Sequence, residues 1–188
     1  MLIDPECSIL LCIDVQERLA PAIHKHKEVI AANAWLFDIA SHLGISVHAT
    51  EQYPDGLGPM VPQLRNRLDK SYIHQKMHFS WMETTKARSV HYGFSHWVVT
   101  GTEAHVCVQQ TVLQALERGT DVYVVDEAVG SRTPLDKQRA LERMRVAGAS
   151  IVTREMVAFE WLRRADTEAF KAVQPMLREG LPYLEHNP

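Results

Sequence analysis

The chain has 188 residues, of which 46% are hydrophobic and 23% are charged, and its formal net charge at pH 7 is −3. This length fits one globular domain over residues 1–188, and the apolar content is sufficient for a core that needs no disulfide or metal. The slightly acidic balance argues against nucleic acid and anionic membrane surfaces as partners.

The N-terminus and the cysteines indicate a reducing compartment. The first residues are acidic and interrupted by Pro5, which is unlike a signal or transit peptide, and the apolar run 9–13 is too short to cross a bilayer. Cys7 and Cys12 lie in or beside one expected strand, with about 16 Å between their Cα atoms, which is beyond the reach of a disulfide. We therefore expect a cytoplasmic protein with free thiols.

Strand and helix patterns alternate along the chain. The first strand is a nearly continuous apolar run that ends at Asp14, which is typical of a strand buried on both faces of a parallel sheet. Pro21 and Gly44 mark the expected start and end of the first helix, and the proline- and glycine-rich stretch 51–69 is expected to be a loop. The other expected strands are 45–50, 71–76, 97–101, 121–126 and 149–153, and the other expected helices are 84–92, 106–118, 134–148 and 155–178. This order predicts an α/β fold, a three-layer α/β/α domain with a mostly parallel six-stranded sheet.

Three chemically active side chains follow the ends of three expected strands. Asp14 ends the first and Lys76 the third, while Cys107 lies just after the fourth, in the first turn of the next helix. Because open parallel sheets bind ligands beyond the carboxyl ends of their strands, these side chains are candidates for one shared site. The helix N-terminus also predicts a lowered pKa for the Cys107 thiol.

Each of these residues also has an ordinary structural interpretation. The carboxylate of Asp14 would suit a turn or a helix cap, and Lys76 would suit a solvated surface position. A free cysteine such as Cys107 is often a small, inert side chain in the core. The residue types alone therefore leave a catalytic and a structural interpretation open.

The segments around the three residues resemble the isochorismatase-like cysteine hydrolases. They are Cys-Ile-Asp-Val-Gln at 12–16, Gln-Lys-Met-His-Phe-Ser at 75–80 and Val-Thr-Gly-Thr-Glu-Ala-His-Val-Cys-Val at 99–108, and the resemblance extends over residues 8–161. The stretch 51–58 further resembles a subgroup with poorly defined substrates and differs from the nicotinamidases. The resemblance implies a Rossmann-like sheet and hydrolysis of a small carbonyl compound, with an amide favoured.

The resemblance also implies a role for each residue of the triad. Cys107 would be the nucleophile that forms a thioester, Asp14 the general base and Lys76 the cationic partner, which agrees with the need of a thiol for a neighbouring base and cation. A cis peptide is implied between Thr102 and Glu103, together with an oxyanion hole from the backbone N–H groups of Glu103 and Cys107. Four residues near the strand ends are candidates for the substrate pocket, although each would also suit a loop or core position: Gln16, Tyr53, Phe79 and Trp81.

No metal or other cofactor is expected. Metal-binding nicotinamidases of this fold carry Asp-x-His after the second strand, where this chain has Thr50-Glu51-Gln52. The Gly-Leu-Gly at 56–58 follows the wrong strand for a dinucleotide site, and no Walker motif is present.

Two other functions stay open at this stage. The chain would also suit a non-catalytic binding or assembly protein on the same fold. A further alternative is vinyl-ether hydrolysis of the isochorismate type, which needs no cysteine. The apolar residues within 156–162 offer more apolar surface than one exposed helix normally carries, which favours a homo-oligomer, although packing of some of them on the parent sheet would also account for them.

Overall fold

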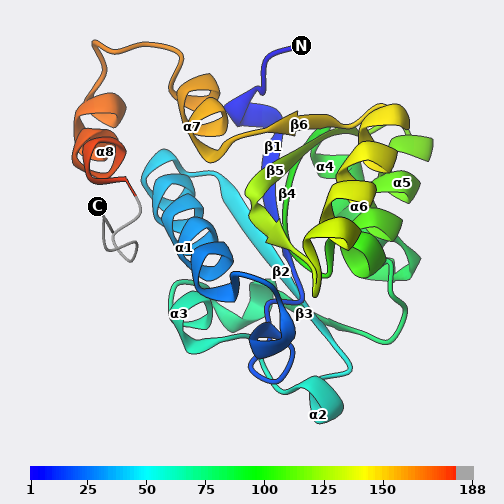
Figure 1. Cartoon of the computed structure of the whole chain (residues 1–188). Helices are drawn as coiled ribbons and strands as arrows, with labels where there is room; N and C mark the ends of the chain where they lie inside the picture. Colours follow the sequence, from blue (N-terminus) through cyan, green and yellow to red (C-terminus); the bar gives the residue numbers. More distant parts are fainter. Residues whose placement is uncertain (181–188) are drawn as a thin grey trace.

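The chain forms a parallel sheet of six strands, in the order β3-β2-β1-β4-β5-β6. A computed structural model describes residues 1–180 (Figure 1). Every neighbouring pair of strands is parallel, so the expected α/β class is confirmed. The strands are β1 Ser8–Ile13, β2 Ser46–Gln52, β3 Ile73–Lys76, β4 His96–Thr102, β5 Asp121–Gly130 and β6 Ser150–Val152.

Helices cover both faces of the sheet. On one face lie α1, α7 and α8, and on the other lie α4, α5 and α6 (Figure 1). The α-helices are α1 His26–Leu43, α2 Pro54–Leu57, α3 Pro62–Arg65, α4 Thr85–Gly93, α5 Gln109–Glu117, α6 Pro134–Val146, α7 Arg154–Leu162 and α8 Glu168–Glu179. Alternate residues of β1 enter the two cores, with Leu10 and Cys12 on the α1 side and Leu11 and Ile13 on the α5 side. This explains why the strand is apolar throughout.

Several expected boundaries differ from the structure. The first helix begins at His26 instead of Pro21, because Pro21 lies in a short 3₁₀ turn and Lys25 adopts a left-handed conformation. The expected loop at 51–69 contains the short helices α2 and α3. The expected helix 155–178 is divided into α7 and α8. Residues 181–188 of the expected domain lie outside the described residues.

The surface of α7 is less apolar than its sequence indicates. Trp161 and Leu162 are buried, whereas Met156 and Phe159 are 45% and 51% exposed. Packing of the last turn of α7 therefore accounts for Trp161 and Leu162. The homo-oligomer stays a prediction that rests on the exposed Met156 and Phe159.

The structure brings the ends of β1 and β4 very close together. Gly101 pairs with Ile13 and has a φ of +113°, and a Cβ there would stand 2.1 Å from the Ile13 carbonyl oxygen. Only glycine fits such a position. This close approach places the end of β4, and the turn that follows it, beside Asp14, the residue after Ile13. No helix among residues 1–180 is both long and apolar enough to span a membrane.

Candidate active site

Asp14 follows β1 directly and is held by both neighbouring strands. Its φ is 53°, a left-handed conformation that aspartate tolerates better than most residues. The Asp14 N–H donates to the Thr50 carbonyl at 3.1 Å, and the Thr102 hydroxyl donates to the Asp14 carbonyl at 2.7 Å. The side chain is fully buried. The carboxylate therefore has a fixed position at the carboxyl edge of the sheet.

Lys76 ends β3 and forms a buried ion pair with Asp14. Its Nζ lies 2.6 Å from Asp14 Oδ2, and neither side chain has solvent exposure. Nζ also donates to Gln52 Oε1 at 2.8 Å and to the Phe79 carbonyl at 3.0 Å. An ammonium group has three protons, and these three oxygens accept them. Lys76 is thus a fixed cation and not a solvated surface lysine.

Cys107 lies on the short π-helical turn Ala104–Val108, which continues into α5. The Thr111 hydroxyl donates to the Cys107 carbonyl at 2.8 Å, which fixes the turn from the helix side. Cys107 is only 5% exposed, and the charges of both Asp14 and Lys76 act on the pKa of its thiol. The structure therefore brings together the three residues that the strand ends indicated.

The expectation of a lowered thiol pKa is wrong for this state of the protein. Burial raises the pKa of the Cys107 thiol well above its usual range, and the negative charge of Asp14 raises it further. The Lys76 ammonium lowers this pKa but does not outweigh the other two effects. The resting group is a protonated thiol beside a carboxylate, so any attack by sulfur requires that its proton be removed.

The peptide between Thr102 and Glu103 is cis, as the resemblance implied. Glu103 precedes the π-helical turn that carries Cys107, and its carbonyl accepts the N–H groups of Val106 and Val108 at 3.0 and 3.3 Å. Its carboxylate accepts a hydrogen bond from Arg132 Nε at 2.6 Å. The turn is thus anchored through both the backbone and the side chain of Glu103. The oxyanion hole from the Glu103 and Cys107 N–H groups stays a prediction.

The four candidate pocket residues fall into two groups. Tyr53 and Phe79 are 48% and 54% exposed and adjoin Lys76, since the Tyr53 N–H donates to the Lys76 carbonyl at 3.0 Å. Trp81 is fully buried and stacks on His74, with 5.6 Å between ring centroids. Trp81 is therefore a core side chain, and only Tyr53 and Phe79 stand at the rim of the site.

Gln16 is also buried, and backbone groups occupy both ends of its amide. Its Nε2 donates to the carbonyls of Gln52 and Gly58 at 3.0 and 2.6 Å, and its Oε1 accepts the Gln52 N–H at 2.8 Å. Such a side chain has little capacity left for a ligand. In the structure the Gln16 side chain links the segment after β1 to the end of β2 and to the loop that follows β2. These bonds hold the backbone beside the site in place.

Sequence reasoning missed Thr50 and Gln52 as parts of the site. The Thr50 hydroxyl donates to Asp14 Oδ1 at 2.6 Å, and Gln52 binds Lys76 as described above. Both residues lie at the end of β2, the strand between β1 and β3. The signal that could have found them is this position, since a strand between the strands that end at Asp14 and Lys76 must deliver its own last residues to the same edge.

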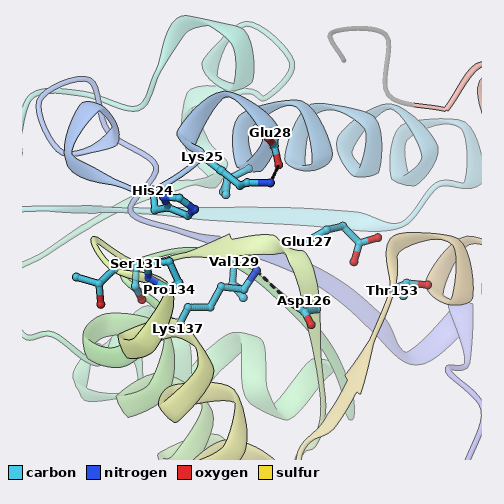
Figure 2. Close-up of a pocket in the computed structure, with 12 residues that line it drawn as sticks. His24, Lys25, Glu28, Asp126, Glu127, Val129, Ser131, Pro134, Lys137 and Thr153 are labelled. Atoms are coloured by element: carbon cyan, nitrogen blue, oxygen red, sulfur yellow. Dashed lines mark ion pairs between the residues drawn. The ribbon is translucent and has the colours of Figure 1, made fainter. Parts of the chain in front are cut away.

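A separate cavity of about 420 Å³ lies between α1, β5 and the start of α6 (Figure 2). Its charged side chains are largely paired, with Lys137 2.9 Å from Asp126 and Lys25 3.3 Å from Glu28. None of the three triad residues lines it. Because the charged side chains of this cavity already have partners, they are less available to react with a substrate than Asp14, Lys76 and Cys107. We therefore place the candidate active site at these three residues.

The histidines form no metal site within residues 1–180, where no group of three or more His, Cys, Asp and Glu side chains is suited to a metal ion. Two histidines do contact each other, with 3.0 Å between His48 Nδ1 and His74 Nε2. Burial lowers the pKa of both to about 4, and the nearby charge of Lys86 acts in the same direction. Both rings are therefore neutral at pH 7.

These two histidines predict a loss of stability in acid. Unfolding returns each pKa to about 6.5, so the unfolded chain binds more protons between pH 6.5 and 4. We expect the free energy of unfolding to be fully retained above pH 6.5 and to fall by roughly 2–4 kcal/mol as the pH decreases to 4. Denaturant unfolding at several pH values measures this.

A His74→Phe variant provides the contrast for that measurement. It should show a shallower loss between pH 6.5 and 4, whereas a variant of the exposed His78, His78→Asn, should follow the parent curve. Parallel curves for all three proteins would contradict the assignment of the acid sensitivity to the His48–His74 contact.

Comparison with known proteins gives one consistent result. The family profile described as "Isochorismatase domain" matches residues 8–156. "Isochorismatase family protein 1A" of Dictyostelium discoideum is 34% identical over 192 aligned positions, which cover 99% of this chain and 93% of that protein.

Solved structures show the same similarity. The structure described as "MAR1 Ribonuclease from Caenorhabditis elegans" has a TM-score of 0.92 and 36% identity, and the match covers 100% of this chain and 98% of that one. The structure of YcaC from Pseudomonas aeruginosa, which contains hexane-2,5-diol and covalent acrylamide, has a TM-score of 0.84 and 27% identity over 93% of this chain and 91% of that one.

Proposed function

Because the chain belongs to the isochorismatase family, whose fold and sequence indicate a hydrolase, we propose that it hydrolyses a small carbonyl compound, with an amide favoured, through a thioester on Cys107. One observation carries the proposal. Asp14 and Lys76 form an ion pair at 2.6 Å whose two charges both act on the Cys107 thiol, and all three groups are buried. This combination of nucleophile, base and cation meets the needs of acyl transfer by a cysteine.

In the first step sulfur attacks the substrate carbonyl carbon while the thiol proton moves to Asp14. The C–S bond forms, and the carbonyl oxygen becomes an oxyanion, which the Glu103 and Cys107 N–H groups are placed to stabilise in this proposal. Collapse of this intermediate breaks the C–N bond. The amine leaves with the proton that Asp14 holds, and the acyl group stays on sulfur as a thioester.

In the second step Asp14 takes a proton from a water molecule that attacks the thioester. The C–S bond then breaks, the sulfur recovers its proton from Asp14, and the carboxylic acid is released. Lys76 gives no proton in either step, because oxygens of Asp14, Gln52 and Phe79 accept all three. Its contribution is electrostatic: its charge opposes the effect of Asp14 on the thiol.

The burial of the triad favours a small substrate. Cys107 is 5% exposed and Lys76 4% exposed, while the neighbouring Tyr53 and Phe79 have half of their surfaces free. In this proposal the carbonyl enters between these two rings, which leaves little room for a polymer. A covalently bound acrylamide in the related YcaC is consistent with a reactive group that accepts small amide-bearing molecules.

Three other functions compete with this proposal. Vinyl-ether hydrolysis and non-catalytic binding both leave Cys107 without a chemical role. Ribonuclease activity is suggested by the printed description of the C. elegans relative. Against it stand the net charge of −3 and the nearly closed triad, since nucleic acid binding depends on an accessible, positively charged surface.

A substrate panel tests the proposal. Small primary amides, anilides, esters and one structured RNA would be incubated with the wild-type chain and with Cys107→Ser, each before and after dialysis against a chelator. We expect at least one amide to be hydrolysed by the wild type only, with no loss after chelation and no cleavage of RNA that depends on Cys107. Cys107-dependent RNA cleavage, or activity that zinc or iron must restore, would contradict the proposal.

A further inference from the structure

The last residues of β2 supply a set of hydrogen bonds to the Asp14–Lys76 pair that the reaction itself does not use. Thr50 is fully buried and holds Asp14 twice, since its carbonyl accepts the Asp14 N–H at 3.1 Å and its hydroxyl donates to Oδ1 at 2.6 Å. A hydroxyl that donates to a carboxylate forms a charge-assisted bond, which is among the stronger hydrogen bonds in proteins. Thr50 therefore fixes the orientation of the carboxylate.

Gln52 acts on the other charge of the pair. Its Nε2 donates to the Met77 carbonyl at 2.9 Å, which leaves its Oε1 to accept from Lys76 at 2.8 Å. The backbone of Gln52 is held in turn by Gln16. Because a carbonyl oxygen can only accept, the bond to Met77 determines which end of the Gln52 amide faces the ammonium.

A buried ion pair needs such partners. Removal of two charges from water is costly, and their mutual attraction offsets this cost only when the remaining donors and acceptors are also satisfied. Here Oδ1 of Asp14 binds Thr50, Oδ2 binds Lys76, and the remaining ammonium protons bind Gln52 and Phe79. Two of these hydrogen bonds come from side chains that belong neither to the ion pair nor to Cys107, and these side chains are Thr50 and Gln52.

We propose that Thr50 and Gln52 are positioning residues, which hold the Asp14 carboxylate and the Lys76 ammonium in the orientation that the reaction at Cys107 requires. This inference rests on the proposed function. It assigns the end of β2, residues 50–52, to the support of a cysteine mechanism.

The test uses alkylation of Cys107 by acrylamide, followed against pH by peptide mass mapping, so that no substrate is required. In Thr50→Val we expect the alkylation rate at its maximum to fall by about tenfold to hundredfold, the scale of one hydrogen bond to a charged group. Thr50→Ser keeps the hydroxyl that donates to Asp14 Oδ1 and should restore the rate.

Two further variants complete the test. Thr100→Val removes another buried threonine hydroxyl, which donates to the Leu11 carbonyl on the adjacent strand β1. This variant should leave the alkylation of Cys107 unchanged. Gln52→Met removes the acceptor from Lys76 and should slow the alkylation by about tenfold or more. If Thr50→Val does not fold, Thr50→Ala carries the same expectation with no added bulk.

The outcomes separate this inference from the proposed function. If Cys107 is not alkylated in the wild type while Cys7 is, the proposed function fails. If Cys107 is alkylated but the profiles of Thr50→Val and wild type coincide, only the positioning role is overturned. An equal loss in Thr50→Val and Thr50→Ser would likewise overturn it, because the hydroxyl would then not be the group that matters.

Discussion

Replacement of Cys107 by alanine is expected to reduce hydrolysis of the best amide in the panel by about 10⁴-fold or more. Removal of the nucleophile of a covalent mechanism leaves only the residual rate that binding and oxyanion stabilisation provide. The structure predicts little effect on folding, because the change removes one sulfur atom and no hydrogen bond on which the backbone depends. Measurement of kcat/KM and of the melting temperature for both proteins checks the two parts of this prediction.

The matched control is Cys7→Ala. Cys7 is half-buried beside the start of β1, at the opposite edge of the sheet from the triad, and its thiol has no part in the proposed reaction. Its activity should equal that of the wild type within a factor of about two. Retention of activity in Cys107→Ala would indicate cysteine-independent chemistry, such as vinyl-ether hydrolysis, and would remove the thioester from the mechanism.

Substitution of Lys76 by methionine should lower activity by about a hundredfold or more, the scale of one charge-stabilising group in an active site. Methionine keeps most of the bulk of the side chain but removes the charge. The Lys76 ammonium lowers the pKa of the Cys107 thiol, so its loss leaves burial and Asp14 unopposed and this pKa rises further. Alkylation of Cys107 at a fixed pH should slow by a similar factor.

The same substitution is expected to destabilise the fold, which must be separated from the effect on catalysis. Lys76→Met leaves the Asp14 carboxylate buried without its cation, at a cost of about 3–5 kcal/mol. The double variant Asp14→Asn with Lys76→Met removes both charges and should recover most of this stability while it stays inactive. Normal activity in Lys76→Met, or an inactive double variant as unstable as the single one, would contradict the role given to the pair.

The residues of the triad could be predicted because the sheet topology is visible in the sequence. Asp14 and Cys107 each follow an apolar run, Lys76 ends a weaker strand pattern, and parallel strands deliver the residues at their ends to one edge. The contacts between them could not be predicted. They depend on Gly101, which brings β4 against Ile13, and on Thr50 and Gln52, polar residues with no distinctive pattern.

The thiol pKa shows where reasoning from one local feature fails. The N-terminal position of Cys107 on its helix favours a thiolate, but this effect falls off within a turn and is smaller than the cost of burial beside Asp14. Two of the four candidate pocket residues fail for a similar reason. Trp81 and Gln16 lie near the strand ends in sequence, yet the aromatic contacts of one and the backbone bonds of the other turn both away from a ligand.

The start of the first helix was misplaced because proline favours the first turn of a helix but does not require one. Pro21 enters a 3₁₀ turn that ends at Ile23 in an extended conformation, and a turn at 24–25, with Lys25 left-handed, then precedes His26. The short helices α2 and α3 were missed because each has only four residues, which is below the length at which apolar periodicity can be detected.

The central claim is a thioester on Cys107, and the mass of the intact protein during turnover tests it most directly. An active ester or anilide found in the panel would be mixed with the enzyme, quenched in acid within one turnover and analysed by mass spectrometry with peptide mapping. The account predicts an adduct with the mass of the acyl group on the peptide that contains Cys107, which disappears as product forms and is absent in Cys107→Ser. Turnover with no acyl adduct at any time, or an adduct on another residue, would contradict it.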